Sequence, residues 1–133
     1  MLEAQNNGRF KTFIAHCGTF DLKTWYSTTE ELWFANFDLG GPWWNSPQPK
    51  SYTESDPINF IDKWKAPIMI ITGEKDFRIP YTQSLEAFQI CQLKGIKSRL
   101  LVFPDEGHWI LKPQNSEFWY TNVLDWLRKH LNP

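Results

Sequence analysis

The stretch Pro67-Ile-Met-Ile-Ile-Thr72 is followed directly by Gly73. Its side chains are apolar in both alternating positions, which is typical of a strand buried inside a parallel sheet. Two further short apolar runs, Phe10–Cys17 and Ser98–Phe103, end at a glycine and at a proline respectively, and we predict both as strands. The sequence therefore predicts a parallel sheet with Pro67–Thr72 as a buried strand.

Two helical patterns alternate with these strands. Between the second and third strands, Pro80–Leu93 places apolar residues on one helix face, and Gly95 follows as a suitable helix end; the face consists of Tyr81, Leu85, Phe88 and Cys91. After the third strand, Asn115–Leu131 starts with a potential cap at Asn115 or Ser116 and ends in basic residues; its apolar stripe consists of Tyr120, Val123, Leu124, Leu127 and Leu131. This alternation predicts an α/β fold of about three parallel strands, with right-handed crossovers and flanking helices.

The segment from Thr19 to Trp64 is different, because four prolines and the sequence Gly40-Gly41-Pro42 interrupt it. We predict one short helix here, Thr28–Phe37, with a capped start at Thr28-Thr29-Glu30-Glu31. A long insertion between strands is usually either functional or flexible. Loops at the carboxyl ends of parallel strands build the site in such folds.

The composition excludes several classes of protein. The chain has 133 residues, of which 41% are hydrophobic and 17% aromatic, enough for one globular domain and against intrinsic disorder. A net charge of −1 gives no strong electrostatic field for binding nucleic acid or anionic lipid. No apolar run reaches the roughly 20 residues of a membrane span. Cys17 and Cys91 are interpreted as buried thiols, and because no CxxC or HxxxH spacing occurs, we assign no metal and no cofactor.

Two loops carry the residues with chemistry. Asp76 follows the second strand and His108 follows the third, so adjacent parallel strands bring both to the same sheet edge. An Asp that accepts the Nδ1 proton of a His orients that His as a general base. Each residue alone has a simpler explanation, a solvated loop acid and a structural histidine. The pair in this order predicts the Asp and His of an α/β-hydrolase triad.

The nucleophile of such a triad is missing from the sequence. The motif G-x-S-x-G does not occur, because none of the seven serines has a glycine two residues away on either side. Cys17 is a poor substitute, since no helix follows it closely. The chain is therefore expected to begin after its nucleophile and to be inactive by itself.

The residues from 8 to 131 resemble the last part of the prolyl oligopeptidase family of serine peptidases, in its bacterial dipeptidyl-peptidase and acylaminoacyl-peptidase branch. The matching text reads RFKTFIAHCGTFDL, TTEELWF, GGPWW, GEKDFRIP, FPDEGHWILKPQNSEFWY and VLDWL. The resemblance implies that residues 1–133 are part of an α/β-hydrolase catalytic domain that acts on peptides. It places the triad Asp at Asp76 and the triad His at His108. It also implies that the serine and an N-terminal β-propeller lie upstream in full-length members.

The resemblance also implies substrate-binding residues. Arg78 matches a position that holds a substrate carbonyl, and an alternative is a surface arginine paired with Glu74 or Asp105. Ile79 and the pair Trp25-Tyr26 match the walls of a side-chain pocket, with core packing as the alternative for the pair. Four further residues receive structural roles: Trp33, Trp43 and Trp44 as packing residues, and Glu106 as a loop acid.

Two other functions stay open at this point. One is a non-catalytic α/β association domain, and the other is part of an esterase or lipase of the same fold, which the peptidase-like motifs disfavour. Because the strand Lys11–Cys17 lacks the neighbour that precedes the nucleophile, we also expect its edge to promote self-association as a homodimer.

Overall fold

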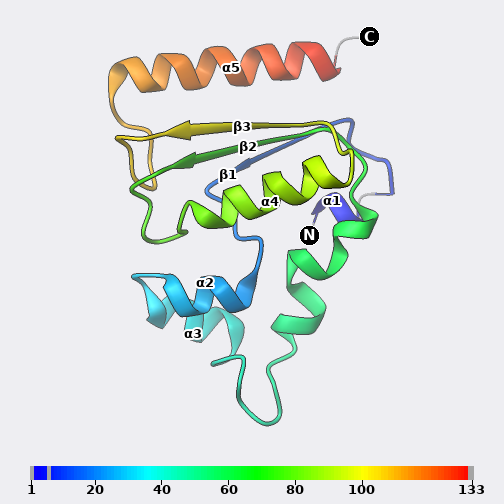
Figure 1. Cartoon of the computed structure of the whole chain (residues 1–133), viewed down its shortest axis with the longest axis vertical. Helices are drawn as coiled ribbons and strands as arrows, with labels where there is room; N and C mark the ends of the chain where they lie inside the picture. Colours follow the sequence, from blue (N-terminus) through cyan, green and yellow to red (C-terminus); the bar gives the residue numbers. More distant parts are fainter. Residues whose placement is uncertain (1, 6, 132–133) are drawn as a thin grey trace.

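Three parallel strands form one sheet in the computed structural model, which describes residues 2–5 and 7–131. The strands are β1 (Phe13–His16), β2 (Ile68–Gly73) and β3 (Ser98–Phe103), in the order β1-β2-β3 (Figure 1). Phe13 pairs with Ile68, and Ile68 pairs with Ser98, so all three carboxyl ends meet at one edge. The predicted fold class is thus confirmed, although β1 is shorter than the predicted Phe10–Cys17.

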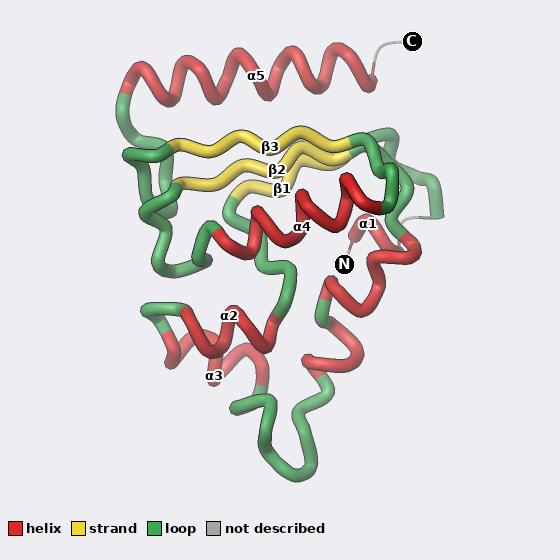
Figure 2. Tube along the Cα trace, in the orientation of Figure 1, coloured by secondary structure: helices red, strands yellow, loops and turns green. Residues whose placement is uncertain are grey.

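The central strand β2 is buried throughout, because helices cover both faces of the sheet (Figure 2). Ile68 and Ile70 pack with residues of α4 (Thr82–Leu93) on one face. Met69 and Ile71 pack with residues of α5 (Pro113–Leu131) on the other. The continuous apolar run therefore fills two cores at once, as expected of a parallel sheet.

The buried faces of these two helices differ from the predicted stripes. In α4 the buried residues are Gln83, Ser84, Ala87 and Cys91, while Leu85 is exposed. Gln83 is buried because its Oε1 accepts the backbone N–H groups of Phe20 and Asp21, at 2.8 and 2.9 Å. In α5 the buried residues are Val123 and Trp126, whereas Tyr120, Leu124 and Leu131 are exposed.

The start of α5 also differs from the prediction. The helix begins at Pro113, a residue that suits the first helical turn because its missing N–H would be unpaired there anyway. Asn115 does not cap it: its side-chain amide donates to Asp105 and Glu106 instead. Asn115 therefore lies within the first turns of α5, and its side chain binds the loop after β3 instead of capping the helix.

The insertion contains two α-helices where one helix was predicted, followed by two short helical segments of other types. The α-helices are α2 (Leu22–Thr28), capped by the Asp21 carboxylate, and α3 (Leu32–Leu39). The predicted helix Thr28–Phe37 is wrong because the chain is extended at Thr29, with φ −69° and ψ 140°, and its hydroxyl donates to the Arg78 carbonyl. The residues taken as a capped helix start therefore form the link between α2 and α3.

The insertion forms a second core together with Ile79 of the loop after β2; its own members are Leu22, Trp25, Tyr26, Ala35, Leu39 and Tyr52. After α3 the insertion continues through a π-helical turn, η1 (Ser51–Ser55), and a 3-10 helix, η2 (Pro57–Lys63). The N-terminal helix α1 (Leu2–Gln5) lies against η2. Trp33 is 66% exposed, so the prediction that it is a packing residue is wrong. Trp44 is 61% exposed, but its ring packs edge-on against the buried Tyr26. Among the described helices, none has both the length and the apolar character needed to cross a bilayer.

Candidate active site

The loops that follow β2 and β3 lie against each other through their backbones. The Lys75 N–H donates to the Glu106 carbonyl at 2.9 Å, and the Glu74 N–H donates to the Phe103 carbonyl at 2.9 Å. A Cβ added to Gly73 would overlap the carbonyls of Glu106 and Gly107. Only glycine therefore fits at Gly73, and this close approach fixes the distance between the two loops.

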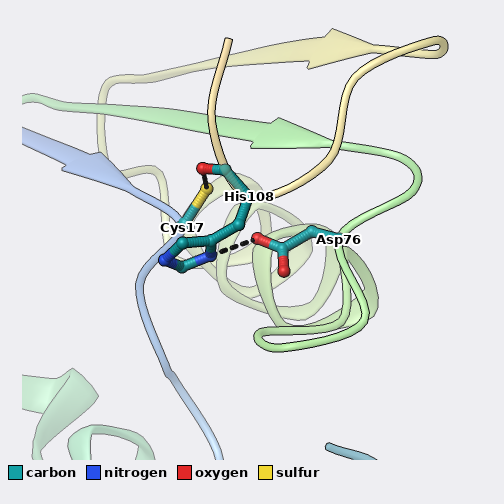
Figure 3. Close-up of side chains that lie close together, drawn as sticks. All are labelled: Cys17, Asp76 and His108. Atoms are coloured by element: carbon teal, nitrogen blue, oxygen red, sulfur yellow. Dashed lines mark hydrogen bonds and ion pairs between the residues drawn. The ribbon is translucent and has the colours of Figure 1, made fainter. Parts of the chain in front are cut away.

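This arrangement joins Asp76 to His108, as the sequence predicts (Figure 3). The His108 Nδ1 lies 2.8 Å from the Asp76 Oδ2, within the range of a charge-assisted hydrogen bond. The other carboxylate oxygen accepts the backbone N–H groups of Arg78 and Ile79, at 3.0 and 2.9 Å. The Asp76 side chain is fully buried, whereas His108 keeps a quarter of its surface open to solvent.

Cys17 lies next to this pair, at the carboxyl end of β1 (Figure 3). Its backbone has φ 49°, a left-handed conformation that is uncommon outside glycine. Its thiol donates to the His108 carbonyl oxygen at 3.3 Å. Burial, aided by a hydrogen bond and the charge of Asp76, raises the pKa of the thiol to about 12. Cys17 is thus a neutral thiol rather than a reactive thiolate.

A cavity of about 380 Å³ opens beside the pair. It brings together four predicted site residues, His108, Arg78, Ile79 and Trp25. Sequence reasoning did not assign the other lining residues to a substrate site; these are Cys17, Thr29, Glu31, Phe34 and Asp38. A larger cavity of about 660 Å³ lies by Phe10 and Lys63 and contains none of the predicted residues.

Arg78 is held on two sides by other parts of the site. One guanidinium nitrogen lies 2.8 Å from a Glu31 carboxylate oxygen, and the guanidinium lies over the Trp109 ring, 5.0 Å from its centre. The partner is thus Glu31 rather than Glu74 or Asp105. The Arg78 Nε is buried and has no hydrogen-bond partner within the part of the chain that the structure describes. Arg78 lines the cavity and keeps about a third of its side-chain surface exposed.

The two aromatic residues of α2 have different environments. Trp25 lines the cavity, and its Nε1 donates to the Arg78 carbonyl at 2.9 Å. Tyr26 is buried in the core of the insertion, where its hydroxyl lies 3.0 Å from the Asn36 Oδ1. Of the predicted pair, only Trp25 reaches the cavity surface.

Glu106 has a structural position in the loop between β3 and α5. Its carboxylate accepts the N–H groups of Lys112 and Leu111 and the side-chain amide of Asn115. Desolvation opposes ionisation, but these hydrogen bonds outweigh it and lower the pKa of Glu106. Glu106 is thus a loop acid, and its buried carboxylate anchors the segment that carries His108.

The sequence model of the prolyl oligopeptidase family matches residues 1–133. The chain belongs to the prolyl oligopeptidase family. This membership accounts for the parallel sheet with helices on both faces.

Two curated relatives in the family are dipeptidyl-peptidases 5. That of Porphyromonas gingivalis is 44% identical over 133 residues, covering 98% of this chain and 19% of the relative. That of Schizosaccharomyces pombe is 41% identical over 120 residues, covering 90% and 17%. The chain spans about a fifth of the length of the curated relatives it matches.

Solved structures share the fold at lower sequence identity. An acylaminoacyl peptidase of Pyrococcus horikoshii has a TM-score of 0.87 at 20% identity, covering 98% of this chain and 22% of that one. A puromycin-hydrolyzing peptidase of Mycobacterium tuberculosis has a TM-score of 0.85 at 21% identity, covering 98% and 20%. These structures show that this prolyl oligopeptidase family chain adopts the α/β-hydrolase architecture.

Proposed function

We propose that Asp76 and His108 are two members of a Ser-His-Asp triad in a serine exopeptidase. The observation that carries this proposal is the 2.8 Å contact between His108 Nδ1 and Asp76 Oδ2 at adjacent strand ends. The Asp76 carboxylate keeps the Nδ1 proton in place, which leaves Nε2 as the base. His108 then takes the proton of a serine hydroxyl and later gives it to the leaving amine.

The cavity beside His108 is the proposed substrate site. Trp25, Phe34 and Ile79 supply an apolar wall suited to an uncharged side chain, and the guanidinium of Arg78, which also lines the cavity, supplies N–H donors for a peptide carbonyl. Tyr26 supports Trp25 from behind, within the same core. The substrate class that fits this combination is a peptide.

Among peptidase types, we favour a dipeptidyl-peptidase. The relatives at 44% and 41% identity are dipeptidyl-peptidases 5. The acylaminoacyl peptidase is related at 20% identity, where the likeness concerns the fold. Membership of a peptidase family also argues against the esterase or lipase alternative.

We propose that these 133 residues are one part of a catalytic domain. The nucleophile would then come from polypeptide outside them. No serine of the chain stands in a G-x-S-x-G motif. Without the covalent step and the oxyanion donors, acyl transfer loses most of its catalysis. The isolated chain should neither react with a fluorophosphonate probe nor hydrolyse dipeptidyl chromogenic substrates. Hydrolysis that disappears in His108→Ala would contradict this.

A chimera tests the triad roles directly. This chain replaces the matching segment of the Porphyromonas gingivalis dipeptidyl-peptidase 5, and hydrolysis of dipeptidyl substrates is measured. Asp76→Asn and His108→Ala should each lower kcat by about 10³-fold or more, because removal of triad members has effects of this size. The matched controls are Asp105→Asn, a solvent-exposed loop acid, and His130→Ala, near the end of α5. Full activity of the Asp76 and His108 variants would overturn the proposal.

A second candidate function, association with another chain, has its own structural support. In the described part of the chain, β1 pairs with β2 on one side and with no strand on the other. Trp33 and Phe37 of α3 are also largely exposed. An open strand edge and exposed rings both favour contact with another chain. We propose that the isolated chain forms a homodimer through this edge or the neighbouring apolar surface.

A further inference from the structure

Three side chains that are far apart in sequence bring different ligand atoms together. The Cys17 Sγ, an Asp76 carboxylate oxygen and a His108 ring nitrogen all lie within 4.8 Å of one another. They come from the carboxyl end of β1 and from the loops after β2 and β3 (Figure 3). One sulfur, one nitrogen and one oxygen ligand form a mixed set that suits a borderline-soft divalent cation.

We propose that Cys17, Asp76 and His108 form a binding site for a thiophilic divalent cation, with Zn²⁺ as the best match. Zinc bonds of about 2.0–2.3 Å to these atom types place tetrahedral ligands roughly 3.3–3.6 Å apart. The three ligand atoms now lie within 4.8 Å of one another. Binding would move Oδ2 and Nδ1, which are 2.8 Å apart, away from each other and would draw the sulfur into the shell. Hard cations such as Mg²⁺ are disfavoured, because they prefer an all-oxygen shell.

The surroundings support a bound cation in two ways. The Asp76 Oδ1 accepts two backbone N–H groups, which fixes the carboxylate that would bind through Oδ2. Cys17 and His108 both line the 380 Å³ cavity, so a fourth ligand, water or a substrate group, can approach from there. The site thus has three ligands and one open position.

When the cation binds, the thiol loses one proton, the imidazole keeps its own, and the hydrogen bonds of Cys17 and Asp76 with His108 are replaced by bonds to the cation. The thiol gives up its proton to solvent and leaves the His108 carbonyl. The imidazole keeps its single proton, which moves from Nδ1 to Nε2 as Nδ1 binds the cation. The cation therefore takes the place of the hydrogen bond between Asp76 and His108, so the two arrangements exclude each other.

Cation binding to these three side chains does not depend on the proposed function. Its effect on catalysis does, because that effect requires His108 to act as the base. With the proton on Nε2, His108 has no lone pair there with which to accept the proton of a serine. A cation at this site would therefore inhibit a peptidase that uses His108 as its base. Cation binding is measured on the isolated chain and the triad roles on the chimera, so failure of one leaves the other intact.

Calorimetric titration of the full chain with Zn²⁺ tests the site, with a parallel Cd²⁺ titration followed by sulfur-to-metal absorption in the ultraviolet. We expect one cation per chain, and Cd²⁺ absorption that needs Cys17. Cys17→Ser should weaken binding by at least tenfold and remove the absorption. Asp76→Asn and His108→Ala should weaken binding as well, while circular dichroism checks that each variant is folded.

Matched controls separate this site from adventitious binding. Cys91→Ala removes the other thiol, and His130→Ala removes a histidine at the far end of α5. Both should bind Zn²⁺ as the unchanged chain does. Equal affinity in Cys17→Ser, loss of binding in either control, or no binding by the unchanged chain would each overturn the proposal. If Cys17→Ser does not fold, loss of the Nδ1 proton resonance of His108 on adding Zn²⁺ to the unchanged chain decides the question.

Discussion

The carboxylate of Asp76 binds His108 through one oxygen and its own loop through the other. The Oδ2 lies 2.8 Å from the His108 Nδ1, while the Oδ1 accepts the N–H groups of Arg78 and Ile79. Because the backbone fixes this fully buried side chain, Asp76 is the rigid partner and orients the more exposed imidazole. The arrangement is complete within the 133 residues, since every group in it belongs to β2, β3 or their loops.

Gly73→Ala should separate the two loops. The added methyl group would overlap the carbonyls of Glu106 and Gly107, and relief requires the segment carrying His108 to move. We expect a loss of about 1–3 kcal/mol in the free energy of unfolding, the usual cost of overpacking. Urea denaturation measures this loss, and the downfield Nδ1 proton resonance of His108 should weaken.

Gly18→Ala is the control for this substitution. Its methyl group would meet the Ala15 Cβ at 3.7 Å, an ordinary contact. A Gly73→Ala variant as stable as Gly18→Ala would show that the loops are not held at this distance.

Arg78→Ala should weaken substrate binding more than the chemical step. A hydrogen bond from a charged donor to a peptide carbonyl contributes about 1.5–3 kcal/mol, so KM of the chimera should rise about tenfold or more. Arg78→Lys should not restore KM, because lysine lacks the planar fork of guanidinium donors. Arg99→Ala on β3, outside the cavity, serves as control. A change confined to kcat would argue against a carbonyl-binding role.

Asp56→Asn should alter how stability depends on pH. Burial is the main cause of a raised pKa of Asp56, whose Oδ1 accepts the Leu22 N–H at 3.1 Å. The folded state therefore holds this proton more tightly than the unfolded state, and the stabilising effect is lost as pH rises through the folded-state pKa. The asparagine oxygen can still accept from Leu22 and carries no charge.

Urea denaturation at a series of pH values measures the difference. The advantage of Asp56→Asn over the unchanged chain should grow as pH rises from below the ordinary value of 3.8, by about 1.4 kcal/mol for each pKa unit of the shift. A difference that stays constant with pH would mean that the carboxyl group is not perturbed.

Self-association should appear in light scattering over a concentration series. The open edge of β1 and the exposed rings of α3 lead us to expect dimers at micromolar concentrations. Phe37→Ser, at a side chain that is 80% exposed, should shift the equilibrium towards monomer if the apolar surface takes part. A chain that is monomeric at high micromolar concentration, with freely exchanging β1 amides, would contradict the expectation.

The local sequence pattern was sufficient to predict the parallel sheet and the contact between Asp76 and His108. An apolar run bounded by Pro67 and Gly73 forms a strand buried on both faces, because only helices on both sides can keep such a run from water. Parallel strands end at one edge, so the order of Asp76 and His108 along the chain already predicts their meeting. Both the buried strand and the meeting of Asp76 with His108 can be predicted without knowing how the segment that connects the two loops folds.

Everything that depends on contacts between distant segments was decided by tertiary structure. The sequence pattern placed a helix start at Thr28, but Thr29 interrupts the helix, and its hydroxyl binds the Arg78 carbonyl 49 residues away. The partner of Arg78 is Glu31 for the same reason, since the residues that precede α3 lie beside the loop after β2. Cys17 shows the limit most clearly: its spacing to Asp76 and His108 follows no motif, yet the shared edge of three parallel strands brings the three side chains together. The spacing of residues along the chain predicts only local structure. The contacts between distant residues depend on which strands pair and on where the loops that follow them lie.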